Sequence, residues 1–282
     1  NDITSVQEGA WRSEKLEKLF VYLAMNRNRG VCIEDISEAI WQVEEETDNP
    51  VGALKNLAYR LRKALRDASF GEECIVSVRG GLYKWNDDVE VTIDVEEFDR
   101  YINEAEMAFC RSKETAIESY EKAIALYHGD FLPLRTDTHW FMTLNAFYHS
   151  RYVNTVKALA KLYIDTGCYE KLEQLCTRAI VYERSDEQIY SYLIVARMRT
   201  KKVQMAFDTY ETAKAIMDKD LGVRKTVMLN KVYEELLSVT KGASSYNIDE
   251  VKDDISEESM NGVFMCGYPV FKEIYQLEVR KS

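Results

Sequence analysis

The densest cationic stretch of the sequence runs from Lys55 to Arg66 and has no acidic residue in it. Its five basic members are Lys55, Arg60, Arg62, Lys63 and Arg66. Lysine and arginine neutralise phosphates, so a concentrated group of them can hold a polyanion although the formal net charge of the whole chain is −11. The local charge therefore predicts a contact with nucleic acid, although the negative net charge of the chain taken alone would argue against one.

The element that presents these charges is a predicted helix from Pro50 to about Ala68, with Asn49 as its cap and Pro50 in its first turn. At about 100° per residue, one side of this helix is apolar and the other is polar. The apolar stripe consists of Leu54, Leu57, Ala58, Leu61 and Leu65, and the polar side of Gly52, Asn56, Tyr59 and Lys63.

A helix of this width fits the major groove of double-stranded DNA. We expect Lys55 and Asn56 to contact bases and Tyr59 to pack on a base or a sugar. The remaining cations are expected on phosphates: Arg60, Arg62, Lys63, Arg66 and Arg79. Two alternatives stay open: a solvated basic face with no ligand, and an internal ion pair made by Arg60 or Arg62.

The neighbouring segments complete a small domain. An amphipathic helix is predicted over residues 12–28, with Leu16, Leu19, Phe20, Leu23 and Ala24 on one side and charges on the other. A short helix over 34–41 follows. Strands over 75–78 and 82–85, joined by Arg79-Gly80-Gly81, predict a hairpin. Three helices and a hairpin are the elements of a winged helix.

The run from Leu57 to Leu65, followed by that from Ser77 to Tyr83, resembles the recognition helix and wing of OmpR-type domains. Leu82 and Trp85 depart from the usual glycine and leucine of that wing. In OmpR-type activators the loop between the second and third helices can meet RNA polymerase. The resemblance thus implies a polymerase contact at Glu44, Glu45 and Glu46, with an acidic loop that serves only solubility as the alternative.

From Ile93 onward the sequence predicts helix after helix. Residues pair at an offset of 34, which is the tetratricopeptide period: Leu172 with Ala206, Cys176 with Tyr210, and Ala179 with Ala213. Gly167 stands at the expected turn. The aromatic residues of this region are expected in its core, with a groove for a partner as the alternative: Tyr120, Tyr127, Trp140, Phe141, Phe147, Tyr152, Tyr163, Tyr190 and Tyr192. His128, His139 and His149 are expected to pack or lie at the surface.

Several weak motifs follow one another in this region: Asp94-Val95 with Phe98, Tyr127 to Pro133, Trp140, and Leu221-Gly222-Val223. Their order resembles the bacterial transcriptional activator domain that follows the winged helix in SARP regulators. Arg184 and Lys225 stand where that family prefers proline. The resemblance covers about residues 10–240 and implies a mainly α fold, a winged helix-turn-helix followed by a tetratricopeptide-like repeat domain.

We therefore expect a winged-helix domain over 1–92, truncated at its N-terminal sheet, and a bacterial transcriptional activator domain over 93–240. An acidic linker over 241–261 and a strand-helix segment over 262–282 follow; that segment is either the start of a further module or a docked tail. The chain does not begin with Met, and we expect that its N-terminus has been cut.

Composition excludes other classes of protein. No apolar run reaches the roughly 18 residues of a membrane span and no signal peptide is recognisable, so a cytoplasmic protein is expected. The cysteines lack ligand spacing, which predicts neither a metal site nor disulfides: Cys32, Cys74, Cys110, Cys168, Cys176 and Cys266. Phosphate-loop, nucleophile-elbow and zinc-protease motifs are missing, so neither an enzyme nor a cofactor is expected.

The sequence thus predicts a sequence-specific DNA-binding transcriptional regulator, an activator that contacts RNA polymerase. We expect it to bind as a homodimer, with tandem copies on direct repeats as the alternative. The alternative is a protein-interaction or signal-sensing scaffold whose winged helix does not read DNA.

Overall fold

The computed structural model describes residues 13–41, 49–67, 74–78, 81–89, 92–129, 138–220 and 226–243. The chain divides into two compact units, Asn1–Val232 and Tyr233–Ser282. Apart from the part of its last described helix that follows Val232, every feature described below belongs to the first unit. The predicted strand-helix segment over 262–282 and most of the predicted acidic linker lie outside the described residues.

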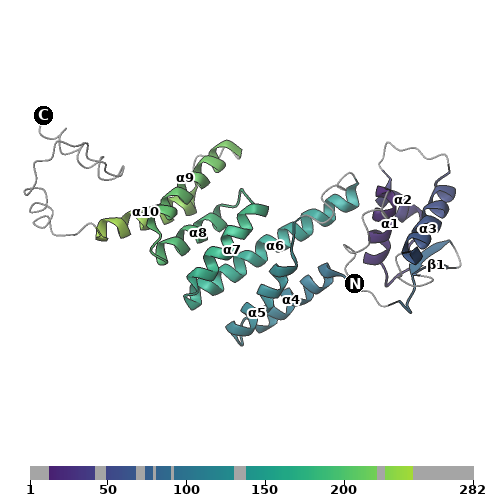
Figure 1. The fold of residues 1–282 in the computed structure, drawn as a ribbon, viewed down its shortest axis with the longest axis horizontal. Helices are drawn as coiled ribbons and strands as arrows, with labels where there is room; N and C mark the ends of the chain where they lie inside the picture. Colours follow the sequence, from purple (N-terminus) through teal and green to yellow (C-terminus); the bar gives the residue numbers. More distant parts are fainter. Residues whose placement is uncertain are drawn as a thin grey trace, which may run out of the picture. The chain divides into compact units, whose positions relative to one another are not determined.

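The first part of the chain contains three helices and a hairpin in the predicted order (Figure 1). Helix α1 spans Glu14–Met25, α2 spans Ile33–Ile40 and α3 spans Pro50–Asp67. Strands β1 (Ile75–Val78) and β2 (Leu82–Trp85) pair antiparallel, with Ile75 opposite Trp85 and Val78 opposite Leu82. Gly81 in the turn has φ 79°, a conformation that favours glycine and explains the predicted glycine turn.

The apolar stripes of these elements meet in one core. Leu19, Ile36, Leu54 and Leu61 are fully buried there, and Trp85 of β2 packs edge-on against Phe20. Burial of such side chains is the main term that stabilises a small domain, at about 1.5–3 kcal/mol each.

One charge lies on the wrong side of the predicted pattern. Lys18 is buried in α1, although all charges of this helix were expected on its outer side. Its Nζ lies 2.9 Å from Oε1 of Glu14, one turn earlier. The ion pair explains how an ammonium group is tolerated among apolar side chains.

The remaining elements are all helical in the described ranges. They are α4 (Asp94–Ala108), α5 (Lys113–Leu126), α6 (His139–Thr166), α7 (Tyr169–Tyr182), α8 (Glu187–Arg199), α9 (Val203–Asp220) and α10 (Val227–Ala243). Successive helices pack on one another, α4 on α5, α6 on α7, α7 on α8 and α8 on α9 (Figure 1). Helix α10 continues to Ala243, beyond the point where the linker was expected to begin.

The 34-residue correspondence has a structural meaning. All six residues that pair at this offset are buried, and they occupy equivalent turns of α7 and α9. Alanine at two of the three pairs of positions lets neighbouring helices approach closely. Gly167 ends α6 with φ 71°, in the left-handed conformation expected of a turn glycine.

The two parts of the first unit share direct contacts. Arg27, after α1, forms a two-pronged ion pair with Glu96 in the first turn of α4. Tyr22 of α1 meets Trp140 of α6 edge-on, with 4.9 Å between ring centroids. Among the described residues, no helix has the length and apolarity needed to cross a membrane.

Candidate nucleic-acid interface

Helix α3 has two chemically distinct sides. Leu54, Leu57, Ala58, Leu61 and Leu65, the predicted apolar stripe, are all buried against α1 and α2. The spacing of these residues at three and four positions brings them to one side of the helix. The prediction of the buried stripe is confirmed, and it fixes which side of α3 faces outward.

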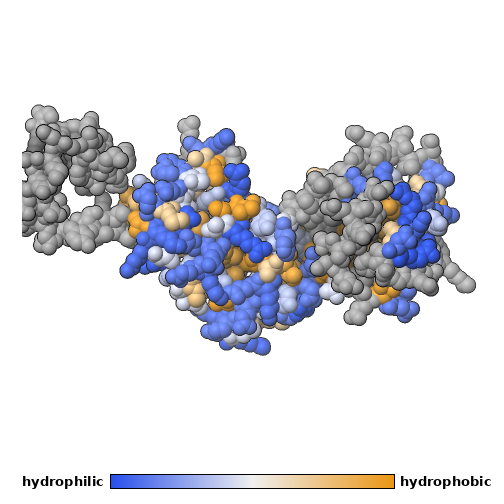
Figure 2. Space-filling view, viewed as in Figure 1, coloured by the Kyte–Doolittle hydropathy of each residue, from blue (hydrophilic) through white to orange (hydrophobic). Residues whose placement is uncertain are grey.

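The outward side carries most of the predicted binding residues. Lys55, Asn56, Tyr59, Arg60, Lys63 and Arg66 are all exposed. Tyr59 exposes 61% of its surface, which is unusual for so large a ring. Figure 2 shows hydrophilic side chains over the part of the molecule where Figure 1 places α3. No hydrogen bond or ion pair to another described residue occupies these six side chains, so their polar groups are available to a partner.

The start of α3 is fixed by a local contact. The side-chain Oδ1 of Asn49 accepts a hydrogen bond from the backbone N–H of Gly52 at 2.9 Å. This is the cap expected of an asparagine directly before a first-turn proline, and it is worth about 1 kcal/mol. The cap determines where the helix begins and therefore the angular positions of Lys55, Asn56 and Tyr59.

Arg62 differs from the other cations of α3. It is half-buried, and its guanidinium is directed to the hairpin. Nε donates to the backbone carbonyl of Ile75 at 2.8 Å, and Nη2 donates to Oγ of Ser77 at 3.0 Å. We expected a phosphate contact or an internal ion pair at this residue. In the structure its guanidinium hydrogen-bonds to uncharged groups of β1. Ser77 had no predicted role, because a lone serine in a strand carries no recognisable signal.

Part of the predicted site lies outside the described residues. Arg79 in the hairpin turn and the acidic loop residues Glu44, Glu45 and Glu46 belong to this part. In the described hairpin, Lys84 Nζ lies 2.5 Å from Oδ2 of Asp87, so this additional cation of the hairpin is paired within the chain.

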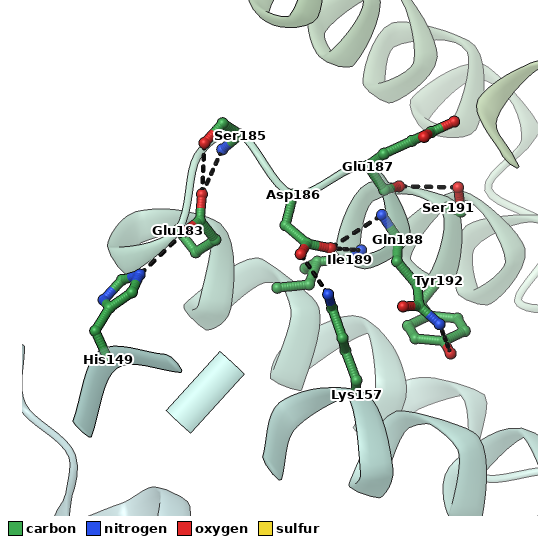
Figure 3. Close-up of polar contacts among 10 residues, drawn as sticks. All are labelled: His149, Lys157, Glu183, Ser185, Asp186, Glu187, Gln188, Ile189, Ser191 and Tyr192. Atoms are coloured by element: carbon green, nitrogen blue, oxygen red, sulfur yellow. Dashed lines mark hydrogen bonds and ion pairs between the residues drawn. The ribbon is translucent and has the colours of Figure 1, made fainter. Parts of the chain in front are cut away.

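A second polar region lies where α6, α7 and α8 meet (Figure 3). Nε2 of His149 on α6 lies 3.0 Å from Oε2 of Glu183, and Oε1 of Glu183 accepts hydrogen bonds from the backbone N–H and the hydroxyl of Ser185. Partial burial acts to raise the pKa of Glu183. Hydrogen bonds from His149 and Ser185 outweigh it and leave that pKa below its ordinary value.

The carboxylates that follow complete this region. Asp186 caps α8 by accepting from the N–H groups of Gln188 and Ile189, both at 3.0 Å, and its Oδ2 lies 2.5 Å from Nζ of Lys157 (Figure 3). Glu187 accepts from the N–H groups of Met228 and Leu229 at the start of α10, at 2.7 and 3.0 Å. These polar groups are therefore satisfied inside the chain and are not free for a ligand.

The aromatic residues of the repeats mostly form a core, as expected. Tyr120, Tyr127, Phe141, Tyr152, Tyr163 and Tyr190 are buried, while Trp140 and Tyr192 are half-buried. Burial raises the pKa of Tyr152 to about 12. Phe147 is the exception, because it exposes 51% of its surface although a core position was expected. Within the described ranges, no group of three or more His, Cys, Asp or Glu side chains could hold a metal ion.

Residues 93–237 match the family described as bacterial transcriptional activator domain. This match covers just over half of the chain. The chain belongs to the bacterial transcriptional activator domain family. This family consists of transcriptional regulators, which are not a class of enzymes.

Two relatives agree with this assignment and extend the similarity toward the N-terminus. The chain is 23% identical to the transcriptional regulator RedD of Streptomyces coelicolor over 238 residues, 83% of this chain and 67% of RedD. Among solved structures, it is similar to Mycobacterium tuberculosis EmbR, solved in complex with a low-affinity phosphopeptide. The TM-score is 0.62 and the identity 19%, over 88% of this chain and 66% of that one. The chain thus spans about two thirds of the length of each.

These findings confirm the predicted SARP-type regulator and the mainly α fold with tetratricopeptide-like repeats. The family assignment rests on the repeats, whereas the predicted DNA contacts lie on α3, outside the matched range.

Proposed function

We propose that this regulator binds double-stranded DNA in a sequence-specific manner through the outward side of α3. The observation that carries this proposal is the exposed set of Lys55, Asn56, Tyr59, Arg60, Lys63 and Arg66 on a helix whose other side is anchored by leucines. Exposed cations without partners in the described chain suit phosphates, an exposed amide suits a base edge, and an exposed aromatic ring can pack on a base or a sugar. The regulator family supports the same conclusion.

The proposal assigns different tasks to the two kinds of side chain. Lys55 and Asn56 contact base edges, and Tyr59 packs on a base or a sugar. Arg60, Lys63 and Arg66 bind phosphates, which give affinity without sequence preference. Arg79 in the hairpin turn adds a further phosphate contact.

The test begins with DNA fragments selected from genomic DNA by the purified chain, followed by gel-shift titrations of the best fragment. The double variant Arg60→Ala/Lys63→Ala should weaken binding roughly thirtyfold or more and reduce the salt dependence by about two phosphate contacts. The double variant Lys161→Ala/Lys219→Ala removes two exposed lysines from α6 and α9 and should bind like the wild type. Equal binding by both double variants, or weak binding without sequence preference, would overturn the proposal in favour of an interaction scaffold.

We further propose that the regulator is an activator that acts in the cytoplasm, binds as a homodimer and contacts RNA polymerase through Glu44, Glu45 and Glu46. An acidic loop suits a basic surface of the polymerase. Charge reversal of these three residues should abolish activation in a reconstituted transcription assay and leave promoter binding intact. Unchanged activation would remove the polymerase contact from the proposal.

A further inference from the structure

The contacts of Arg62 set it apart from the cations around it. Arg60 and Lys63 are exposed without a partner in the described chain, whereas the guanidinium of Arg62 donates two hydrogen bonds to strand β1. A side chain held in this way has fewer donors left for a phosphate. Its two hydrogen bonds instead connect the middle of α3 to β1, the first strand of the hairpin.

The backbone of β1 explains why a donor is needed at this point. The carbonyl of Cys74 accepts from the N–H of Asn86 at 2.8 Å, on the side of β2. Carbonyls alternate in direction along an antiparallel strand, so that of Ile75 is directed away from β2. Ile75 is buried, and an unpaired carbonyl there would be costly. Nε of Arg62 supplies the missing donor at 2.8 Å.

The second hydrogen bond makes the contact specific for arginine. Nη2 reaches the hydroxyl of Ser77, two residues further along β1, at 3.0 Å. Two donors on one rigid guanidinium fix both a distance and an angle between helix and strand. Lysine, with a single nitrogen on a flexible stem, does not reproduce this geometry.

We propose that Arg62 is a positioning residue that locks the β1–β2 hairpin against α3, so that the helix and the hairpin meet DNA as one rigid surface. This inference rests on the proposed DNA binding at α3. The loss of the lock lets the hairpin move and weakens binding to every DNA sequence. Arg79 can still bind its phosphate once the hairpin is ordered on the DNA, so the number of phosphate contacts, and with it the salt dependence of binding, stays the same.

The test compares Arg62→Lys with Arg60→Lys, its matched control two residues earlier on the same helix. Both changes keep the charge. In the free protein, Arg62→Lys should speed amide hydrogen exchange in β1 and β2 about tenfold, and Arg60→Lys should not. With DNA, Arg62→Lys should raise the Kd about tenfold at an unchanged salt slope, whereas Arg111→Lys, at an exposed position outside the proposed interface, should bind like the wild type.

Ser77→Ala provides a second variant that removes only the acceptor of Nη2. It should shift exchange and Kd in the same direction as Arg62→Lys but by about threefold, and it keeps the inference testable if Arg62→Lys does not fold. Exchange of Arg62→Lys equal to that of Arg60→Lys, with an affinity equal to that of Arg111→Lys, would overturn the lock. If no α3 variant changes DNA binding, the proposed function fails, and the exchange experiment without DNA still decides whether Arg62 holds the hairpin.

Discussion

The outward side of α3 and the junction of α6, α7 and α8 are both rich in polar side chains, yet they use them in opposite ways. At the junction, Glu183, Asp186 and Glu187 each accept hydrogen bonds from within the chain. On α3, Lys55, Arg60 and Lys63 are exposed and have no such partner among the described residues. Polar groups that are satisfied internally stabilise a fold, whereas those that are not are available to another molecule.

A change in salt concentration should give the largest difference between the two regions. If Arg60, Lys63 and Arg66 of α3 bind phosphates together with Arg79, the affinity for DNA should fall roughly a hundredfold when salt is raised from about 50 to about 200 mM. The half-buried pairs of the junction are screened much less, so the unfolding free energy should change little over the same range. Gel-shift titrations and urea denaturation at matched salt concentrations measure the two effects. A DNA affinity that is insensitive to salt would contradict the proposed phosphate contacts.

The removal of Asp186 should have the next largest effect, this time on stability. Asp186→Ala deletes the cap of α8 and leaves Lys157 without its partner, so the free energy of unfolding should fall by about 2 kcal/mol. Urea denaturation measures this loss. Glu118→Ala, on the exposed side of α5, is the control and should change stability by less than about 0.5 kcal/mol.

The same variant also sharpens the comparison of the two regions. DNA affinity of the folded Asp186→Ala protein should remain that of the wild type, since Asp186 lies in the repeats. A loss of stability no greater than that of Glu118→Ala would show that the hydrogen bonds at the junction contribute little.

The smallest expected effect concerns the pH dependence of the junction. The folded-state pKa of Glu183 is lowered, so the stability that its carboxylate adds is present in full above the ordinary value of 4.5 and is lost as the pH falls through the folded-state pKa. Wild type should therefore be more stable than Glu183→Gln at neutral pH by about 1 kcal/mol, and this difference should shrink in acid.

Urea denaturation at a series of pH values checks this prediction. Glu118→Gln serves as the control and should show no such trend, because Glu118 is exposed on α5. A constant difference between wild type and Glu183→Gln across the acidic range would mean that His149 and Ser185 do not favour the charged carboxylate.

Much of α3 could be predicted because its signals are local. The leucine spacing determines the buried side, Asn49 determines the start, and both depend on residues within one or two turns. The repeats were predictable for a related reason, since a fixed offset between Ala179 and Ala213 reflects the same packing position in successive units.

The role of Arg62 could not be predicted in the same way. Its partners, Ile75 and Ser77, lie 13 and 15 residues further along the chain. The sequence gives the charge of an arginine but not the direction of its side chain once a strand returns to the helix. Arg60 and Arg62 therefore look equivalent in sequence, although only Arg62 is held by the hairpin.

The predicted core position of Phe147 was wrong for a different reason. It lies in α6, a helix of 28 residues that contacts α2, α5, α7 and α8. A helix with several neighbours does not bury one continuous stripe, so the aromatic type alone does not determine which rings are covered. Tyr148, the next residue, is buried while Phe147 is half-exposed.

The carboxylate of Glu187 belongs to the first turn of α8 but serves the first turn of α10. The start of α10 is therefore stabilised by α8 and should not unfold independently of it. If α8 unfolds locally, the amides of Met228 and Leu229 lose their acceptor, and α10 is destabilised as well. A change that destabilises α8 should therefore also destabilise α10, although α9 lies between them in the sequence.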